Sequence, residues 1–82
     1  RDRPRIMFPP NGARLELAAN GDPIALKIAG GRGLLTVLVN GVPLPPSPGR
    51  RTLFFEPDGP GFVRLTVMDG RGLTDSVMVR LQ

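Results

Sequence analysis

The sequence predicts an all-β domain, and three features of the chain lead to this class. Short apolar runs recur along the chain and are separated by turn signals. The 11 glycines and 10 prolines among 82 residues are too many turn formers for a helical bundle. Hydrophobic residues make up 40% of the chain, which is too apolar for disorder. We therefore expect an immunoglobulin-like or fibronectin-III-like antiparallel β-sandwich of about seven strands.

The length of the chain fits a single domain over residues 1–82. A chain of this size hides only about 60% of its extended surface on folding, so its core is thin and leaves no room for a deep cleft. Residues 1–5 are expected to form a loose linker to whatever precedes the domain. The proline-rich segment 45–49 is expected to be a stiff connection that cannot join a central ladder.

The first three expected strands each end at a turn signal. Residues 5–8 (RIMF) are followed by Pro-Pro-Asn-Gly, and residues 14–18 (RLELA) by Asn-Gly-Asp-Pro. Residues 24–29 (IALKIA) alternate apolar side chains on one face with smaller or charged ones on the other, which predicts a strand with one buried face.

Residues 34–40 (LLTVLVN) are apolar on both faces and are expected to form a central strand. The dipeptide Asn40-Gly41 supplies the positive φ angles of a tight hairpin, which returns the chain through residues 42–44. The next strand is residues 51–56 (RTLFFE).

The last two strands are expected to pair as an antiparallel hairpin. Val63, Leu65 and Val67 alternate with polar or larger residues, and residues 76–81 (SVMVRL) repeat the pattern. The segments Pro57–Gly61 and Asp69–Gly72 carry turn chemistry at the two ends of the first of these strands. Across the chain the predicted inward set is Ile24, Leu26, Ile28, Leu35, Val37, Val39, Phe54, Val63, Leu65, Val67, Val77 and Val79.

Four large apolar side chains remain outside this inward set: Leu38, Leu53, Phe55 and Met68. They are expected on outer or edge surfaces. If they were exposed side by side they would mark an interface, whereas partial burial by loops and by the proline-rich connection would need no partner.

The chain lacks most of the side chains that catalysis uses. It contains no His, Cys, Trp or Tyr, so His bases, thiol nucleophiles, Cys/His zinc sites and disulfides are excluded. Ser47 and Ser76 have no base nearby in sequence, and neither Glu16 nor Glu56 falls in a predicted pocket. We expect no catalytic residue and no cofactor in this chain.

Two glycine-rich segments are expected to be turns rather than ligand loops. The run Asp69-Gly70-Arg71-Gly72 lacks the alternate oxygens of a calcium loop and carries a cation within it. The run Gly30-Gly31-Arg32-Gly33 precedes a strand, whereas a phosphate cradle opens a helix. No metal site is expected.

The net charge of +4 comes from 11 Lys and Arg against 7 Asp and Glu. A nucleic-acid binder would cluster this charge and interleave aromatics with it, and here the charge is spread, so no nucleic-acid partner is expected. Two interpretations stay open, namely solvated strand faces or attraction to an anionic polymer. The arginines that would serve the second are Arg50, Arg51, Arg64 and Arg80.

No signal peptide opens the sequence, and no apolar run reaches the roughly 20 residues of a membrane span. We therefore expect no membrane insertion by this segment. Because no Met stands at position 1, we expect the chain to be part of a longer protein.

Three segments carry a family resemblance: FPPNGARLEL, GRGLLTVLVNGVPL and RRTLFFEPDGPGFVRLTVMDGRGLTDSVMVRL. They resemble the small C-terminal domain of bifunctional penicillin-binding proteins of the 1C type, which polymerise and cross-link peptidoglycan. The resemblance covers about residues 6–81. One position departs from the family pattern, because Val37 stands where an aromatic side chain is common.

The resemblance implies a periplasmic, membrane-anchored parent with glycosyltransferase and transpeptidase domains upstream. The transpeptidase signatures Ser-x-x-Lys and Lys-Thr-Gly do not occur in this chain, so no catalytic residue can be assigned to it by similarity.

Three functions stay open. The first, which we favour, is a non-catalytic accessory module that positions the synthase through contacts with its own transpeptidase domain or with other cell-wall proteins. The second is a peptidoglycan-binding module in which the four arginines would engage peptide carboxylates. The third is a structural spacer. Whether those arginines lie on one sheet face distinguishes the second function from the others.

Overall fold

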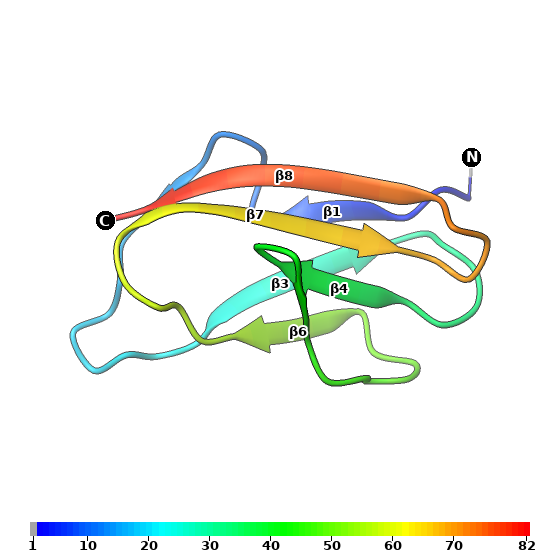
Figure 1. The fold of residues 1–82 in the computed structure, drawn as a ribbon, viewed down its shortest axis with the longest axis horizontal. Helices are drawn as coiled ribbons and strands as arrows, with labels where there is room; N and C mark the ends of the chain where they lie inside the picture. Colours follow the sequence, from blue (N-terminus) through cyan, green and yellow to red (C-terminus); the bar gives the residue numbers. More distant parts are fainter. Residues whose placement is uncertain (1) are drawn as a thin grey trace.

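The computed structural model describes residues 2–82 as two β-sheets packed face to face (Figure 1). The smaller sheet has the strand order β1 (Arg5–Phe8), β3 (Ile24–Ala29), β6 (Thr52–Phe55). The larger sheet has the order β2 (Arg14–Leu15), β8 (Thr74–Leu81), β7 (Gly61–Met68), β4 (Thr36–Val39), β5 (Val42–Pro43). The predicted all-β sandwich is confirmed. It has eight strands because the return leg of the predicted hairpin forms β5.

The chain passes between the two sheets several times. Every strand pair is antiparallel except β2 with β8, which run parallel. The connections from β3 to β4 and from β5 to β6 cross from one sheet to the other. The hairpin of β7 and β8, with eight residues in each strand, is the longest pairing and spans the sandwich from end to end (Figure 1).

The core follows the period-two pattern of β7 and β8. The odd-numbered residues of both strands from Val63 to Val67 and from Val77 to Leu81 are buried, while the even-numbered residues face outward. Nine of the buried core residues lie in β3, β4, β7 and β8, and Ile6 and Phe55 complete the cluster. Val37, which stands at the position that departs from the family pattern, is 3% exposed within this core.

The prediction for the two phenylalanines of β6 is wrong. Phe55 is 3% exposed and belongs to the core, whereas Phe54 is 60% exposed. The register explains the difference, because Leu53 and Phe55 lie opposite Leu26 and Ile24 on the inner face of β3. The sequence Leu-Phe-Phe is apolar at successive positions, so its pattern does not fix which face is buried, and a shift of one residue exchanges the faces.

Three further residues of the predicted inward set, Ile24, Leu35 and Val39, are half-buried and pack against the core rather than lying within it. The central strand is also shorter than predicted, since β4 begins at Thr36. The segment expected as a strand over 14–18 forms only the two residues of β2.

The predicted hairpin at Asn40-Gly41 is confirmed by its backbone. Both residues have positive φ, 51° at Asn40 and 82° at Gly41, which matches the tight turn between β4 and β5. The side chain of Asn40 accepts a hydrogen bond of 2.8 Å from the amide of Arg64 in the neighbouring strand β7. The turn is therefore held to β7 as well as to the two strands that it joins.

Residues 2–5 do not form the loose linker that the sequence suggested. Arg5 begins β1, and Pro4 is among the fully buried side chains. The carbonyl oxygen of Asp2 accepts a hydrogen bond of 2.7 Å from the amide of Gly31. This part of the chain is held against the sandwich by packing and hydrogen bonds. Arg1 lies outside the described residues.

The remaining connections are turns or irregular segments, as predicted. Residues 57–60 and 69–73 frame β7, and residues 45–49 join the hairpin of β4 and β5 to β6. Among residues 2–82 no helix is long and apolar enough to cross a membrane.

Candidate interaction surface

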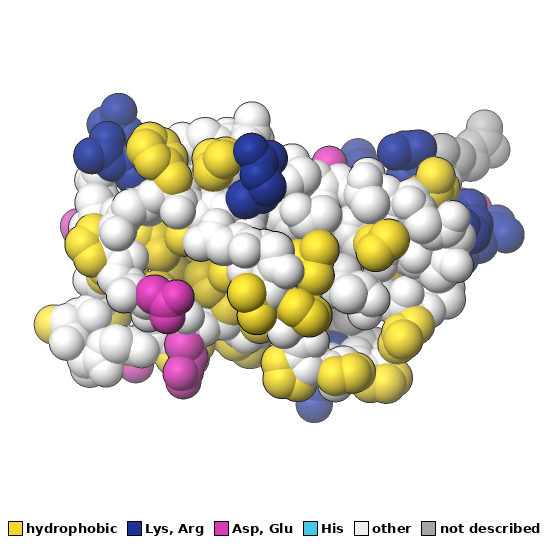
Figure 2. All heavy atoms as spheres, in the orientation of Figure 1, with side chains coloured by type: hydrophobic (Ala, Val, Ile, Leu, Met, Phe, Trp, Pro, Cys, Tyr) yellow, Lys and Arg dark blue, Asp and Glu magenta, His cyan; other side chains and the backbone are white. Residues whose placement is uncertain are grey.

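The outer face of the larger sheet gathers cationic and apolar side chains. It is formed by the even-numbered residues of β7 and β8 together with the outward residues of β2 and β4. We call it the cationic face and define it by Arg14, Leu38, Phe62, Arg64, Met68, Met78 and Arg80. Figure 2 shows dark blue and yellow side chains beside one another over β7 and β8.

Three arginines of the cationic face are placed by strand pairing. Arg14 lies opposite Arg80 in the parallel pair of β2 and β8, and Arg80 lies opposite Phe62 across β8 and β7. The Arg80 guanidinium carbon is 5.5 Å from the centroid of the Phe62 ring, within the range of a cation–π contact. Arg64 lies two residue pairs further along the hairpin, opposite Met78. The arrangement presents guanidinium groups beside apolar surface.

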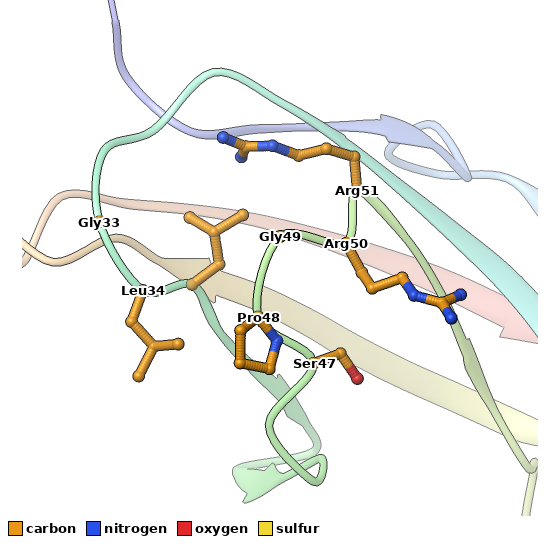
Figure 3. Close-up of a pocket in the computed structure, with 8 residues that line it drawn as sticks. Gly33, Leu34, Ser47, Pro48, Gly49, Arg50 and Arg51 are labelled. Atoms are coloured by element: carbon orange, nitrogen blue, oxygen red, sulfur yellow. The ribbon is translucent and has the colours of Figure 1, made fainter.

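The four arginines singled out in the sequence do not share one face. Arg64 and Arg80 lie on the cationic face, whereas Arg50 and Arg51 precede β6 in the other sheet. The Arg51 guanidinium donates a hydrogen bond to the carbonyl oxygen of Gly30. Figure 3 shows Arg50 and Arg51 extending in opposite directions from the chain. A single carboxylate-binding cluster of these four residues is therefore not formed.

The four large apolar side chains also separate. Leu38 and Met68 are half-buried on the cationic face, and their strands are neighbours. Leu53 is half-buried against the core, and Phe55 lies within it, so the expectation that Phe55 lies on an outer surface is wrong. Sequence reasoning missed Arg14, Phe62 and Met78 as members of the cationic face. The strand alternation of 62–68 and 76–81 identifies Phe62 and Met78 as outward, but only the pairing of β2 with β8 places Arg14 there.

A buried carboxylate organises the end of the sandwich where β7 turns into β8. The side chain of Asp69 is fully buried and accepts five hydrogen bonds of 2.7–3.1 Å. Two come from the side chain of Arg71, and three come from the backbone amides of Arg32, Arg71 and Leu73. Burial opposes ionisation of Asp69, but the Arg71 guanidinium and the three amides outweigh it and hold the pKa of the carboxyl well below its usual value.

The same network holds the start of the chain. Arg71 also donates a hydrogen bond of 2.9 Å to the carbonyl oxygen of Asp2, and the Asp2 carboxylate pairs with Arg32 at 2.6 Å. We call this region, residues 2–4, 30–32 and 69–73, the anchored end. Its charged groups satisfy one another and fix the direction in which the chain enters the domain.

Shallow hollows surround the segment that leads into β6. One of about 290 Å³ is lined by Leu34, Leu35, Gly33 and residues 47–51 (Figure 3). Ser47 is the only hydroxyl among its lining residues, and the chain contains no His that could activate it. Among residues 2–82 no group of three acidic side chains lies close enough to hold a metal ion.

A second hollow, of about 240 Å³, opens between the β4–β5 hairpin and the segment after β6. Phe55, Val39 and Leu44 contribute apolar walls, and Glu56 and Asp58 are the charged residues of its lining. Figure 2 shows magenta side chains beside a recess with hydrophobic side chains in its depth. The molecule thus carries cationic and acidic regions at separate places on its surface.

These features define a small β-sandwich domain with an exposed cationic and apolar face and a chain entry fixed by a polar network. Comparison with family models places the chain more closely. The model of the Penicillin-Binding Protein C-terminus Family matches residues 1–81, and the chain belongs to this family. The comparisons with curated proteins and with solved structures gave no match. The family sets the domain in the context of cell-wall synthesis.

Proposed function

We propose that the chain is a non-catalytic interaction module of a periplasmic peptidoglycan synthase, which it positions through contacts with the transpeptidase domain of the same parent or with other cell-wall proteins. The observation that carries the proposal is the cationic face. Arg14, Arg64 and Arg80 stand there beside Phe62 and Met78 without an acidic partner among residues 2–82.

The composition of the cationic face suits a protein contact. Arginine and aromatic side chains are enriched at the centres of protein interfaces, where the planar guanidinium both stacks and donates several hydrogen bonds. The anchored end supports the same function, since a module that positions its neighbour needs a fixed entry of the chain. The hydrogen bonds that the Asp2 carbonyl oxygen accepts from Gly31 and Arg71 fix this entry.

Direct binding of peptidoglycan peptides is the second candidate. It is favoured by the proximity of Arg14 and Arg80, which lie opposite each other on adjacent strands and could both donate hydrogen bonds to one carboxylate. The separation of Arg50 and Arg51 from this face narrows the candidate site to Arg14, Arg64 and Arg80. Such binding would weaken with salt, because exposed charges are screened over about 8 Å at physiological ionic strength.

The proposal is tested by two-dimensional NMR of the isotope-labelled chain. It is titrated separately with the upstream transpeptidase domain of its parent and with soluble muropeptides. Saturable shifts of the outward residues of β7 and β8 with the protein ligand support the interaction module, and shifts with muropeptides alone support wall binding. Unchanged spectra with both ligands would leave the spacer function.

A charge-reversed variant provides the control for this titration. Arg14→Glu, Arg64→Glu and Arg80→Glu together should weaken the protein contact at least tenfold, on the scale of about 1 kcal/mol for each interfacial arginine. Arg50→Glu, which lies outside the cationic face, should leave it unchanged. Equal effects of both variants would show that net charge, and not this face, drives the contact.

A further inference from the structure

The edge strand β6 carries backbone groups and charges that no other part of residues 2–82 uses. β6 is the last strand of the smaller sheet and pairs only with β3. The amide of Ile28 donates a hydrogen bond of 2.8 Å to the carbonyl oxygen of Arg51, so Arg51, Leu53 and Phe55 direct their backbone groups toward β3. Thr52 and Phe54 therefore direct theirs away, to the open edge.

The other sheet edges are closed by their own chemistry. On β5, Pro43 has no amide to donate. On β1, the amide of Ile6 donates a hydrogen bond of 2.8 Å to the carboxylate of Asp75 in β8. β2 is only two residues long. Among the described strands, β6 is the edge that offers free donors and acceptors on two successive outward-pointing residues, Thr52 and Phe54.

Opposite charges stand at the two ends of this open edge. Arg50 lies two residues before β6, and Glu56 directly follows it. Neither side chain makes an ion pair or a hydrogen bond to any other described residue. Between them Phe54 is 60% exposed, although it is a large aromatic side chain. A hollow of about 460 Å³ beside Thr52 and Phe54 leaves room along the edge.

We propose that β6 pairs with β6 of a second copy of this chain, antiparallel and about a two-fold axis at Leu53. In this register Thr52 lies opposite Phe54 of the second copy, and these are the residues whose backbone groups point to the open edge. Arg50 then lies opposite Glu56 of the second copy, and the symmetry repeats the pair. A single register therefore brings the outward backbone groups of the two strands opposite each other and also pairs the opposite charges, as a self-complementary two-fold contact requires.

The side chains of the paired edge fit the same arrangement. Thr52 and Phe54 share the outer face of the smaller sheet, since alternate residues of a strand lie on one face. Arg50 lines the same hollow as these two residues. The exposed ring of Phe54 then has Arg50 of the second copy as a diagonal neighbour, within reach of an aromatic side chain. The pairing joins two three-stranded sheets into one of six strands.

The contact is small, so its strength depends on concentration. Stable interfaces bury about 1,200–2,000 Å² in total, and one short strand pair supplies less than this. Sedimentation velocity of the chain up to about 1 mM, the range in which weak association is detected, is the measurement. The expected result is a reversible shift from monomer to dimer as the concentration rises.

Reversing the charge of Arg50 or Glu56 tests whether the dimer forms through the β6 edge. Arg50→Glu and Glu56→Arg each replace two attractive pairs by two repulsive ones and should weaken the dimer at least about tenfold. The double variant with both changes restores the attraction and keeps the net charge. An equimolar mixture of the two single variants should dimerise as the wild type does, because each supplies the charge that the other needs.

Two comparisons keep the test decisive. Arg64→Glu makes the same charge change on the cationic face and should leave the dimer unchanged. Because Arg50 and Glu56 are exposed, each single variant should unfold at nearly the same temperature as the wild type, which excludes misfolding. The proposal is overturned if the wild-type chain stays monomeric at about 1 mM. It is also overturned if the single variants dimerise as strongly as the wild type, or if mixing them does not restore dimerisation.

Discussion

The anchored end and the β6 edge use charged residues in opposite ways. At the anchored end, Asp69 is fully buried, and five hydrogen bonds satisfy it. At the β6 edge, Arg50 and Glu56 are exposed and have no partner within residues 2–82. A buried charge is tolerated only when it is fully paired, so the first arrangement serves the fold. Charges left unpaired at a free strand edge cost little alone and remain available for contacts.

The cationic face resembles the β6 edge in this respect. Arg64 and Arg80 stand on a regular, well-paired hairpin, but their guanidinium groups serve no ion pair among the described residues. The fold thus needs the backbone of these strands and the odd-numbered side chains, while the outward side chains are free for other use. The expected effect of a substitution therefore depends on whether the side chain is used by the fold or left free, and not on the net charge of the chain.

The largest expected effect is a loss of stability that differs between the two phenylalanines of β6. Phe55→Ala should destabilise the domain by about 3–5 kcal/mol, because it removes a buried ring from a thin core. Phe54→Ala should change the free energy of unfolding by less than about 0.5 kcal/mol, because the ring is mostly exposed. Urea unfolding of both variants measures the difference, and equal losses would contradict the assigned register of β6.

Removing the buried carboxylate should be the next largest effect. Asp69→Ala leaves the Arg71 guanidinium and three backbone amides without their acceptor. We expect Tm to fall by on the order of 10 °C, as the loss of several hydrogen bonds does in a domain of this size. Differential scanning calorimetry measures it, with Asp58→Ala, an exposed carboxylate, as the control. A similar Tm for both variants would remove the structural role of Asp69.

The close approach of the first residues to the β3–β4 connection depends on Gly30. A Cβ at this position would overlap the carbonyl oxygen of Arg3, and the φ angle of 73° is itself unfavourable for other residues. Gly30→Ala should cost about 1–3 kcal/mol. The matched control is Gly12→Ala, where φ is 83° and nothing lies within 4 Å of the added Cβ, so the substitution introduces backbone strain and no steric overlap. Equal costs by urea unfolding would mean that residues 2–4 do not pack as described.

The smallest expected effect is a dependence of stability on pH. Because the folded state lowers the pKa of Asp69, its ionised form stabilises the domain above the pKa of the unfolded chain, about 3.9. This contribution is lost as the pH falls below about 4 toward the folded pKa. The Tm difference between the wild type and Asp69→Asn should therefore narrow between pH 6 and pH 2 by thermal scans at about one-unit steps. A constant difference would assign the effect to packing alone.

Much of the fold followed from the sequence where one face alternates cleanly. Residues 62–68 and 76–81 carry a branched aliphatic residue at every second position, and the structure buries the predicted side chains there. The hairpin at Asn40-Gly41 was also predictable, because few residues adopt positive φ at both positions. In β6, apolar residues at successive positions left the register open, and only pairing with β3 decides that Phe55 is buried.

Sequence reasoning predicted the candidate sites less completely, because they depend on pairing between distant segments. Arg14 joins Arg80 only through the parallel pairing of β2 with β8. Asp69 was recognised as a turn residue, but the hydrogen bond that it accepts from Arg32 and its link to Asp2 through Arg71 join three separate parts of the chain. Local patterns do not specify such contacts, and turn chemistry alone does not reveal that the carboxylate is buried.

Amide hydrogen exchange of the dilute wild-type chain tests the central claim most directly. We predict that the amides of Gly31, Arg32, Arg71 and Leu73 at the anchored end exchange as slowly as those of the core strands, because the fold uses them. The amides of Thr52 and Phe54 should exchange orders of magnitude faster, since no partner within the domain covers the β6 edge. Slow exchange at Thr52 and Phe54 in dilute solution, or fast exchange at the anchored end, would contradict the account.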